Sequence, residues 1–519
     1  MTKHVYLVSI DALRFDCVPY QKNKSFLKKH GVLKYLKTPT LKKLTKKTLN
    51  FTQATTAAPY TSASHASVFT GLYPPNHGVR ALLSPRDQSL KKNILTLAEV
   101  LASEGYETVY ASDEETMTRP LGIDRGFNHY FANDDEALFK FIKKNKDKKL
   151  LIFKHFFDVH DPYLLTGFSK KKNINRDLEK LLIDKAKEIK IDLSKDESLY
   201  EKWRSVFGGF RNNIQELLPL YLLGISKFDQ GRFKNFIDFL EKNDEFDKSL
   251  MFFFADHGEG RCDSNNLSFF AHGGELFEDV MRVPLFIYHH SLSADILEKQ
   301  VSLIDIFPTI IDLLFDEQPF LYPRYKLDGI SLLDEKKKHG FTYCEMWRSN
   351  KEHPQDYPTN KNWILCQRAI RTPKAKFILN GQVEKLLNDK DLSLAKLKRY
   401  ITCKFSDDET KFVKKQEVIN KINQILNDPD LELTKYIDLI ADPFEKNPID
   451  LIKVGTLKNK MLISYFLNLL FSIEKPNIKF SFLDEIPYFQ LLQKSILNDK
   501  KYSLKKQIIK TFFRQKYEK

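Results

Sequence analysis

Short apolar runs alternate with amphipathic stretches from residue 1 to about residue 330. Such alternation is typical of a doubly wound α/β sheet, in which helices cover both faces and the strands are buried. Residues Tyr221 to Glu241 have apolar side chains at helical spacing, which predicts one helix packed on this sheet. We expect the following runs to form strands: His4 to Ile10, Glu107 to Ala111, Leu150 to Phe156, Leu250 to Ala255 and Val283 to Tyr288.

Three of these runs lead directly to acidic residues or histidine. Asp11 follows the first run, and His160 lies shortly after the third. Asp256 and His257 follow the fourth. Because the carboxyl ends of parallel strands meet at one edge of a sheet, we expect these side chains to converge there. Carboxylate and imidazole groups are typical ligands of a divalent cation, so the pattern predicts a metal site.

A hydroxyl-rich segment, PYTSASHASVFTGLYPPNHGVR, spans residues 59–80. It predicts a loop that leads at Thr61 into a short helix, which ends at Gly71 and the following Pro74-Pro75 pair. A hydroxyl at a helix N-terminus lies among unpaired backbone N–H groups, which stabilise a developing alkoxide. Thr61 beside a metal is therefore a candidate nucleophile. The alternative is that these hydroxyls only cap the helix.

Taken together, these motifs resemble the sulfatase family of the alkaline phosphatase superfamily. The matching segments follow the family's order and cover roughly residues 1 to 450. They include VSIDALRFD, SASHASVFTGLYPPNHGVR, DVHDPY, ADHGEG, HGGELFEDVMRVPLFIY and YIDLIADPFEKNPID. The resemblance implies a mixed doubly wound sheet flanked by helices, with a smaller C-terminal α+β subdomain. We expect a sulfatase-like catalytic α/β domain at 1–335, a C-terminal subdomain with a small antiparallel sheet at 336–455, and a basic helical tail at 456–519.

Three positions depart from the family's pattern. Thr61 stands where sulfatases carry the Cys or Ser that is oxidised to formylglycine, and Thr cannot form that aldehyde. Ala12 replaces a second metal-binding Asp. Asp113 stands where many sulfatases have a lysine that holds the sulfate, and its charge would repel a sulfate dianion. Thr with His65 four residues on instead resembles the nucleotide pyrophosphatase branch, and Thr nucleophiles also occur in phosphoglycerol and phosphoethanolamine transferases.

The resemblance implies one divalent metal ion. Asp11, Asp256 and His257 match metal-binding positions of the family, and the Thr61 hydroxyl would complete the set. One imidazole among oxygen ligands favours Mn²⁺ or Zn²⁺, and Ca²⁺ and Mg²⁺ stay open as alternatives. Ala12 removes one carboxylate from the family's set of metal ligands, and this loss also favours Mn²⁺ or Zn²⁺.

The resemblance also implies catalytic roles for three histidines. His160 matches a family residue that contacts oxygens of the transferred group. His272 is the candidate general acid, which protonates the leaving oxygen. His65 would orient the Thr61 hydroxyl or a phosphate oxygen. His155, in contrast, is interpreted as a supporting or structural residue.

We expect a metal-dependent hydrolase that cleaves phosphate mono- or diesters through Thr61. One alternative is a sulfuric ester hydrolase. Another is a phospho-group transferase of the phosphoglycerol or phosphoethanolamine type, which would act on a polysaccharide or lipid intermediate. A third is a non-enzymatic binding protein with a decayed site. The expected partner is an anionic ester substrate rather than a nucleic acid, and the sequence leaves the oligomeric state open.

Composition adds expectations about the surroundings of the protein. The 83 Lys and Arg against 68 Asp and Glu give a net charge of +15, which favours anionic partners. Five widely spaced cysteines without a C-x-x-C motif indicate free thiols in a reducing compartment. A first strand that begins near residue 4 leaves no room for a signal peptide, so we expect a cytoplasmic protein. A basic amphipathic helix over residues 501–514 would either contact an anionic membrane peripherally or dock on its own protein.

Overall fold

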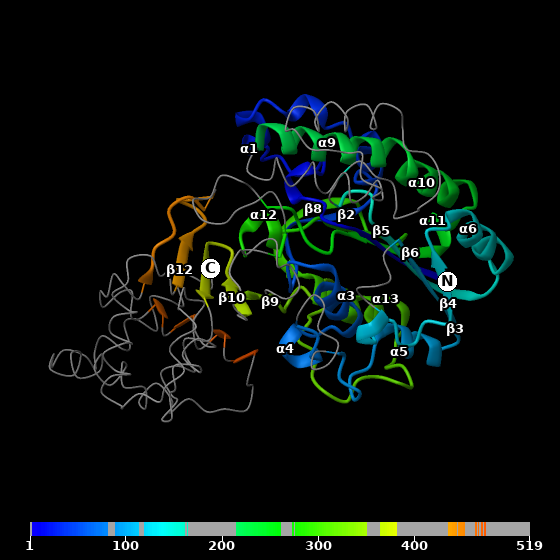
Figure 1. Ribbon diagram of the computed structural model, residues 1–519. Helices are drawn as coiled ribbons and strands as arrows, with labels where there is room; N and C mark the ends of the chain where they lie inside the picture. Colours follow the sequence, from blue (N-terminus) through cyan, green and yellow to red (C-terminus); the bar gives the residue numbers. More distant parts are fainter. Residues whose placement is uncertain are drawn as a thin grey trace, which may run out of the picture. The chain divides into compact units, whose positions relative to one another are not determined.

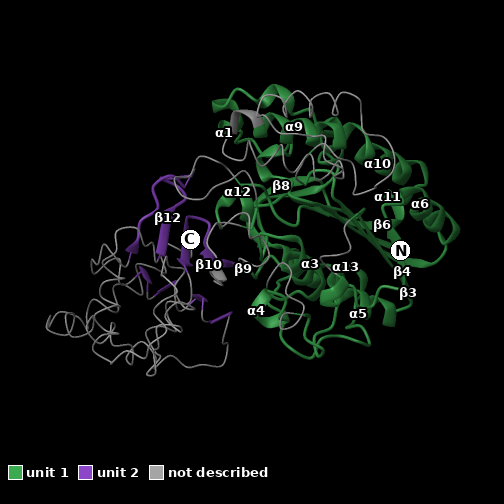
Figure 2. Cartoon of the chain, viewed as in Figure 1, with its two compact units in different colours: residues 1–338 green, residues 339–519 purple. Residues whose placement is uncertain are grey.

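The computed structural model contains two compact units, residues 1–338 and residues 339–519 (Figure 2). It describes residues 3–80, 89–113, 119–160, 163, 214–260, 272–273, 276–349, 364–380, 434–443 and 445–451, with single helical positions between 462 and 473. The basic helix expected at 501–514 lies outside the described residues. Among the residues that are described, no helix combines the length and the apolar character needed to cross a bilayer.

The first unit is built on an eight-stranded sheet with the order β4-β3-β5-β1-β6-β7-β2-β8 (Figure 1). Strands β4, β3, β5, β1 and β6 run parallel, whereas β7 is antiparallel to both of its neighbours and β2 is parallel to β8. The expected mixed α/β sheet is therefore confirmed. The strands are β1 (His4–Ile10), β2 (Leu49–Thr55), β3 (Tyr106–Ser112), β4 (His129–Ala132), β5 (Lys149–Phe156), β6 (Ser249–Phe254), β7 (Leu285–Tyr288) and β8 (Asp295–Ser302).

Helices cover both faces of this sheet (Figure 1). One layer contains α1 (Ser25–Lys29), α9 (Ile214–Gln230) and α10 (Arg232–Lys242). The opposite layer contains α3 (Thr61–Thr70), α4 (Pro74–His77), α5 (Leu97–Ser103) and α13 (Ile306–Leu314). The remaining helices are α2 (Pro39–Leu44), α6 (Asp135–Lys144), α11 (Glu245–Lys248) and α12 (Glu278–Met281), with 3₁₀ turns at Phe15–Cys17, Leu33–Tyr35, Arg119–Leu121 and Leu303–Asp305.

The prediction of a single helix over Tyr221 to Glu241 is wrong, because the chain forms two helices there, α9 and α10. Gly231 separates them with φ −107° and ψ −102°, which is not a helical conformation. A Cβ atom at this glycine would lie 2.8 Å from the carbonyl oxygen of Lys227, so the break has no room for a side chain. The apolar spacing continues across the break and hides it in the sequence. The break places Arg232 in the first turn of α10.

Strands β1 and β5 carry different chemistry on the two faces of the sheet. Side chains alternate along a strand, so neighbouring residues point to opposite faces. Ser9 and His155 are register partners and both contact the α3 side of the sheet. Lys154, one residue earlier, lies over the ring of Phe156, which packs against α10. One polar cluster therefore forms under α3 and another under α10.

The second unit contains a four-stranded antiparallel sheet with the order β12-β11-β10-β9. Phe377 on the third of these strands in the chain is buried and stacks on Phe466, with ring centroids 5.1 Å apart. The small antiparallel sheet expected after the catalytic domain is thus present. Its strands are β9 (Thr342–Ser349), β10 (Ile364–Arg371), β11 (Ala375–Asn380) and β12 (Thr434–Asp438).

Candidate active site

Thr61 is the first residue of α3, which ends at Gly71 in the left-handed conformation (φ 65°) as the sequence indicates. Tyr60, in extended conformation, occupies the capping position before the helix, so Thr61 does not have the geometry of a capping residue. The Thr61 side chain instead reaches toward the sheet, where Oγ1 donates to Oδ2 of Asp11 at 3.4 Å. Thr61 is only 3% exposed. Its hydroxyl therefore lies among buried carboxylates.

Asp11 and Asp256 follow the neighbouring strands β1 and β6 and are fully buried. Oδ1 of Asp256 accepts hydrogen bonds from the backbone N–H groups of Ala12 (3.3 Å) and His257 (2.9 Å). Oδ2 of Asp11 accepts from Thr61. One oxygen of each carboxylate is therefore held, whereas Oδ1 of Asp11 and Oδ2 of Asp256 have no hydrogen-bond partner.

His257 adds a nitrogen to these two oxygens. Its Nδ1 lies 2.9 Å from the carbonyl oxygen of Gly258, and because a carbonyl only accepts, Nδ1 carries the hydrogen. The other nitrogen, Nε2, has no hydrogen-bond partner and lies 3.4 Å from Oδ1 of Asp11 and 3.6 Å from Oδ2 of Asp256. This nitrogen and the two carboxylate oxygens are three potential ligand atoms for a cation.

The three ligand atoms of Asp11, Asp256 and His257 lie within 4.8 Å of one another, so this group fits a single divalent cation. The pKa values of the two carboxyls diverge. Burial opposes ionisation of Asp11, but nearby imidazoles, led by His160, hold its pKa below the usual value. Burial and then the charge of Asp11 raise the pKa of Asp256. A bound cation would offset this repulsion.

Two contacts fix the segment that carries Asp256 and His257. Ser64 of α3 donates from Oγ to the carbonyl oxygen of Asp256 at 2.7 Å, which joins the helix to the end of β6. Gly258 packs so closely that a Cβ atom there would lie 1.9 Å from the carbonyl oxygen of Asp279. Only glycine fits this approach, and it holds the preceding His257 against Asp11.

His160 and His272 lie on the more accessible side of the group. His160 is half-buried and the His272 side chain is 17% exposed, whereas His257 is fully buried. The ring of His272 lies 4.8 Å from that of His160 and 4.3 Å from that of His257, measured between centroids. Nδ1 of His272 is 3.4 Å from Oε1 of Glu259. The structure thus brings these histidines together with the carboxylates.

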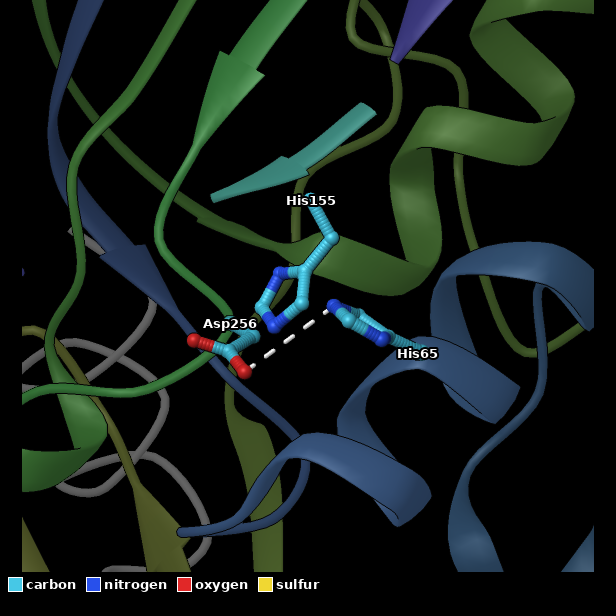
Figure 3. A group of neighbouring side chains, drawn as sticks. All are labelled: His65, His155 and Asp256. Atoms are coloured by element: carbon cyan, nitrogen blue, oxygen red, sulfur yellow. Dashed lines mark ion pairs between the residues drawn. The ribbon is translucent and has the colours of Figure 1, made fainter. Parts of the chain in front are cut away.

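His65 is buried and contacts groups on the sheet. It projects from α3 into the buried group with Nε2 3.0 Å from Oγ of Ser9 and 3.9 Å from Oδ2 of Asp256 (Figure 3). Burial and the neighbouring His155 lower the pKa of His65 well below 6.5, so its imidazole is neutral. The polar contacts found for His65 run to Ser9 and Asp256, and its role in orienting the Thr61 hydroxyl or a phosphate oxygen stays a prediction.

His155, interpreted from the sequence as a supporting or structural residue, lies inside the buried group. It lies in β5 with Nε2 3.3 Å from Oδ2 of Asp11 and Nδ1 3.1 Å from Oγ of Ser9. Burial opposes protonation of His155, but its interaction with Asp11 and the negative charge of Asp11 raise the pKa of His155 above 6.5. The available signal was a histidine inside a buried apolar run, KLLIFKHFF. Such a residue needs a polar partner.

The second polar cluster, under α10, neutralises Asp113. Lys154 lies 3.0 Å from Asp113 and 2.9 Å from Asp135, measured from Nζ. Arg232 donates to the carboxylates of Asp113, Asp135 and Asp158. Despite burial, the charges of Lys154 and then Arg232 hold the pKa of Asp113 below its usual value. Asp113 is therefore not the isolated negative charge that the sequence suggested, because it shares two buried cations with Asp135 and Asp158.

Replacing Arg232 with Gln is expected to destabilise the protein by about 3 kcal/mol. The change leaves buried carboxylates without their shared cation, and breaking a buried ion pair from one side costs roughly 3–5 kcal/mol. Urea unfolding measures this difference. Lys234→Gln on the same helix is the matched control, because Lys234 pairs with Asp238 at the surface and such pairs contribute less than about 1 kcal/mol. Equal stability of the two variants would contradict the prediction.

The mixed eight-stranded α/β sheet with helices on both faces, together with a small antiparallel sheet, is a sulfatase-like fold. The family model for sulfatases matches residues 3–316, and the chain belongs to the sulfatase family. It is thus a sulfatase-family ester hydrolase, and the family is typically metal-dependent.

Solved structures share this fold at low sequence identity. One is a Bacteroides thetaiotaomicron protein from work on the metabolism of multiple glycosaminoglycans, at 15% identity over 94% of this chain and 100% of that one, with a TM-score of 0.59. Another is the phosphonate monoester hydrolase of Agrobacterium radiobacter, at 16% identity over 92% and 96%, with a TM-score of 0.56. A third was solved with its substrate D-glucosamine-2-N,6-O-disulfate, at 14% identity over 92% and 99%, with a TM-score of 0.55.

Proposed function

We propose that this chain hydrolyses phosphate mono- or diesters with Thr61 as the nucleophile and one divalent cation as the cofactor. The observation that carries the proposal is the hydroxyl of Thr61, which donates to Asp11 at the start of α3, directly beside the group that fits a cation. Threonine cannot become formylglycine, so the usual nucleophile of the family is missing here. A threonine alkoxide is a direct nucleophile toward phosphorus.

Asp11, Asp256 and His257 would hold the cation, with the Thr61 oxygen beside them. A set of oxygens with one imidazole suits Mn²⁺ or Zn²⁺. When bound, the cation lowers the pKa of the neighbouring hydroxyl and offsets negative charge on the ester oxygens. The N-terminus of α3 adds its positive dipole end at the same place.

The reaction proceeds in two steps at Thr61. Its oxygen attacks phosphorus in line with the leaving oxygen, so a new O–P bond forms while the ester P–O bond breaks. His272 gives a proton to the leaving oxygen, and His160 donates a hydrogen bond to an oxygen of the transferred group. Water then attacks phosphorus and returns a proton to His272 while the Thr61 O–P bond breaks. The Thr61 oxygen takes up a proton from solvent in place of the one it lost to solvent before its attack, and the product is phosphate from a monoester or a phosphomonoester from a diester. The ester approaches from the side of His160 and His272, since these rings are the more exposed ones.

A sulfate ester is the second candidate substrate. Asp113, which argued against sulfate in the sequence, is paired with Lys154 and Arg232, and this pairing weakens its repulsion of a sulfate dianion. A phospho-group transferase would differ only in the second step, where an acceptor hydroxyl replaces water.

A substrate panel separates these candidates. Purified protein is assayed with aryl phosphate, a phosphodiester, an aryl phosphonate and an aryl sulfate, each with Mn²⁺, Zn²⁺, Mg²⁺ or Ca²⁺. We expect turnover of a phosphoester with Mn²⁺ or Zn²⁺, and a phosphoryl group on Thr61 by mass spectrometry after acid quench. Aryl sulfate turnover that exceeds phosphoester turnover and disappears in Thr61→Ala would overturn the preference for phosphorus. No turnover together with no bound metal would support a decayed site.

A further inference from the structure

A buried chain of polar groups connects Asp11 to α3. Oδ2 of Asp11 lies 3.3 Å from Nε2 of His155, whose Nδ1 lies 3.1 Å from Oγ of Ser9. The same Oγ lies 3.0 Å from Nε2 of His65. These four side chains are fully buried and come from β1, β5 and α3. None of them is exposed to solvent, so their polar atoms depend on each other.

His65, His155 and Asp256 also place ligand atoms within 4.8 Å of one another, as a second cation site would require (Figure 3). The hydroxyl of Ser9 argues against that interpretation. It contacts a nitrogen of each imidazole, so Nε2 of His65 is engaged with Ser9 whichever group carries the proton: either Nε2–H of His65 donates to Ser9, or O–H of Ser9 donates to Nε2. In both arrangements Nε2 of His65 has no free lone pair to offer a cation.

We propose that His155, tethered by Ser9, is a positioning residue that holds Oδ2 of Asp11 so that Oδ1 faces the cation. The proposal rests on the proposed cation site and deepens it. Oδ1 is the Asp11 oxygen without a hydrogen-bond partner, and it is the one that lies 3.4 Å from Nε2 of His257. His155 thus lies at Oδ2 of Asp11, and His257 lies at Oδ1 of the same carboxylate.

The register of the sheet explains why this pair is rigid. Ser9 and His155 are direct partners in the parallel ladder between β1 and β5, so the backbone fixes the distance between their side chains. Asp11 follows two residues after Ser9 on the same face, and its N–H donates to the carbonyl oxygen of Phe156 at 2.9 Å. Hydrogen-bonded partners of metal-binding carboxylates commonly change metal affinity by about 10–100-fold when they are removed.

The test measures metal binding and not only activity. Wild type, His155→Leu, His155→Gln and Ser9→Ala are titrated with Zn²⁺ and Co²⁺ against a chelating dye, and the Co²⁺ absorption spectrum reports the coordination. We expect one ion per chain in wild type, about 10–100-fold weaker affinity in His155→Leu and a smaller loss in Ser9→Ala. His155→Gln keeps an N–H donor and should recover most of the affinity. His129→Leu is the control, because His129 contacts Glu107 on the distant β3–β4 edge.

Each outcome has a distinct meaning. Affinity in His155→Leu equal to that of wild type would overturn the positioning role. Two ions per chain in wild type, with one lost in His155→Leu, would overturn it as well, because His155 would then be a ligand of a second site. If His155→Leu does not fold, unchanged affinity in Ser9→Ala would overturn it. No ion bound by wild type would instead contradict the proposed function itself.

Discussion

Thr61→Val is expected to lower kcat for the best phosphoester by at least about 10⁴-fold, since removing a catalytic nucleophile costs this much or more. Valine has nearly the shape of threonine, so the change removes the hydroxyl and leaves the start of α3 intact. Because Oδ2 of Asp11 also contacts His155, the carboxylate keeps a partner in the variant. Thr61→Ser, which keeps a hydroxyl, should recover measurable turnover. Steady-state kinetics with matched metal loading measure both effects.

Thr70→Val is the matched control for this experiment. Thr70 ends the same helix, and its Oγ1 donates to the carbonyl oxygen of Ala66 at 2.7 Å, away from the carboxylates. Losing this hydrogen bond costs about 1 kcal/mol of stability and should leave kcat unchanged within about twofold. Full turnover in Thr61→Val, with correct folding by circular dichroism, would exclude Thr61 as the nucleophile.

The elements of the first unit follow the apolar pattern closely where burial is complete. The strand from His4 to Ile10 is predicted with its observed bounds, because every one of its residues is buried and Asp11 ends the apolar run. The break at Gly231 was not predicted, since a single glycine in an amphipathic pattern does not interrupt helical spacing. That break matters for the site, because it starts α10 at Arg232.

The sequence predicts those residues of the candidate site that lie at strand ends. Asp11, Asp256 and His257 come directly after apolar runs, and the order of parallel strands brings such positions to one edge. The pairing of Ser9 with His155 depends on the register between β1 and β5, which no local pattern specifies.

The neutralisation of Asp113 was not predictable for the same reason. Lys154 and Arg232 are far from Asp113 in the sequence, and the pattern does not show which face each side chain takes. An argument from one acidic residue at a family position therefore left out the cations that the folded chain places beside it.

Removing the cation should abolish turnover and lower the free energy of unfolding of wild type. A ligand that binds only the folded state stabilises it by about 4 kcal/mol at a concentration near 1,000 times its Kd. Thermal or urea unfolding with excess Zn²⁺ or Mn²⁺, and after dialysis against a chelator, measures the difference. Arg232 variants should keep this dependence on the ion, because their cluster lies under α10 rather than at the cation group.

Asp256→Asn should reverse the order of stability between wild type and variant. Asparagine keeps an oxygen that accepts the N–H groups of Ala12 and His257, but it removes one of two buried like charges. Without an ion the variant should be at least as stable as wild type, because repulsion with Asp11 is relieved. With an ion wild type should be the more stable, because only it keeps both charges that attract the cation. If chelation changes both proteins equally, the two carboxylates do not hold a metal and the site must work without one.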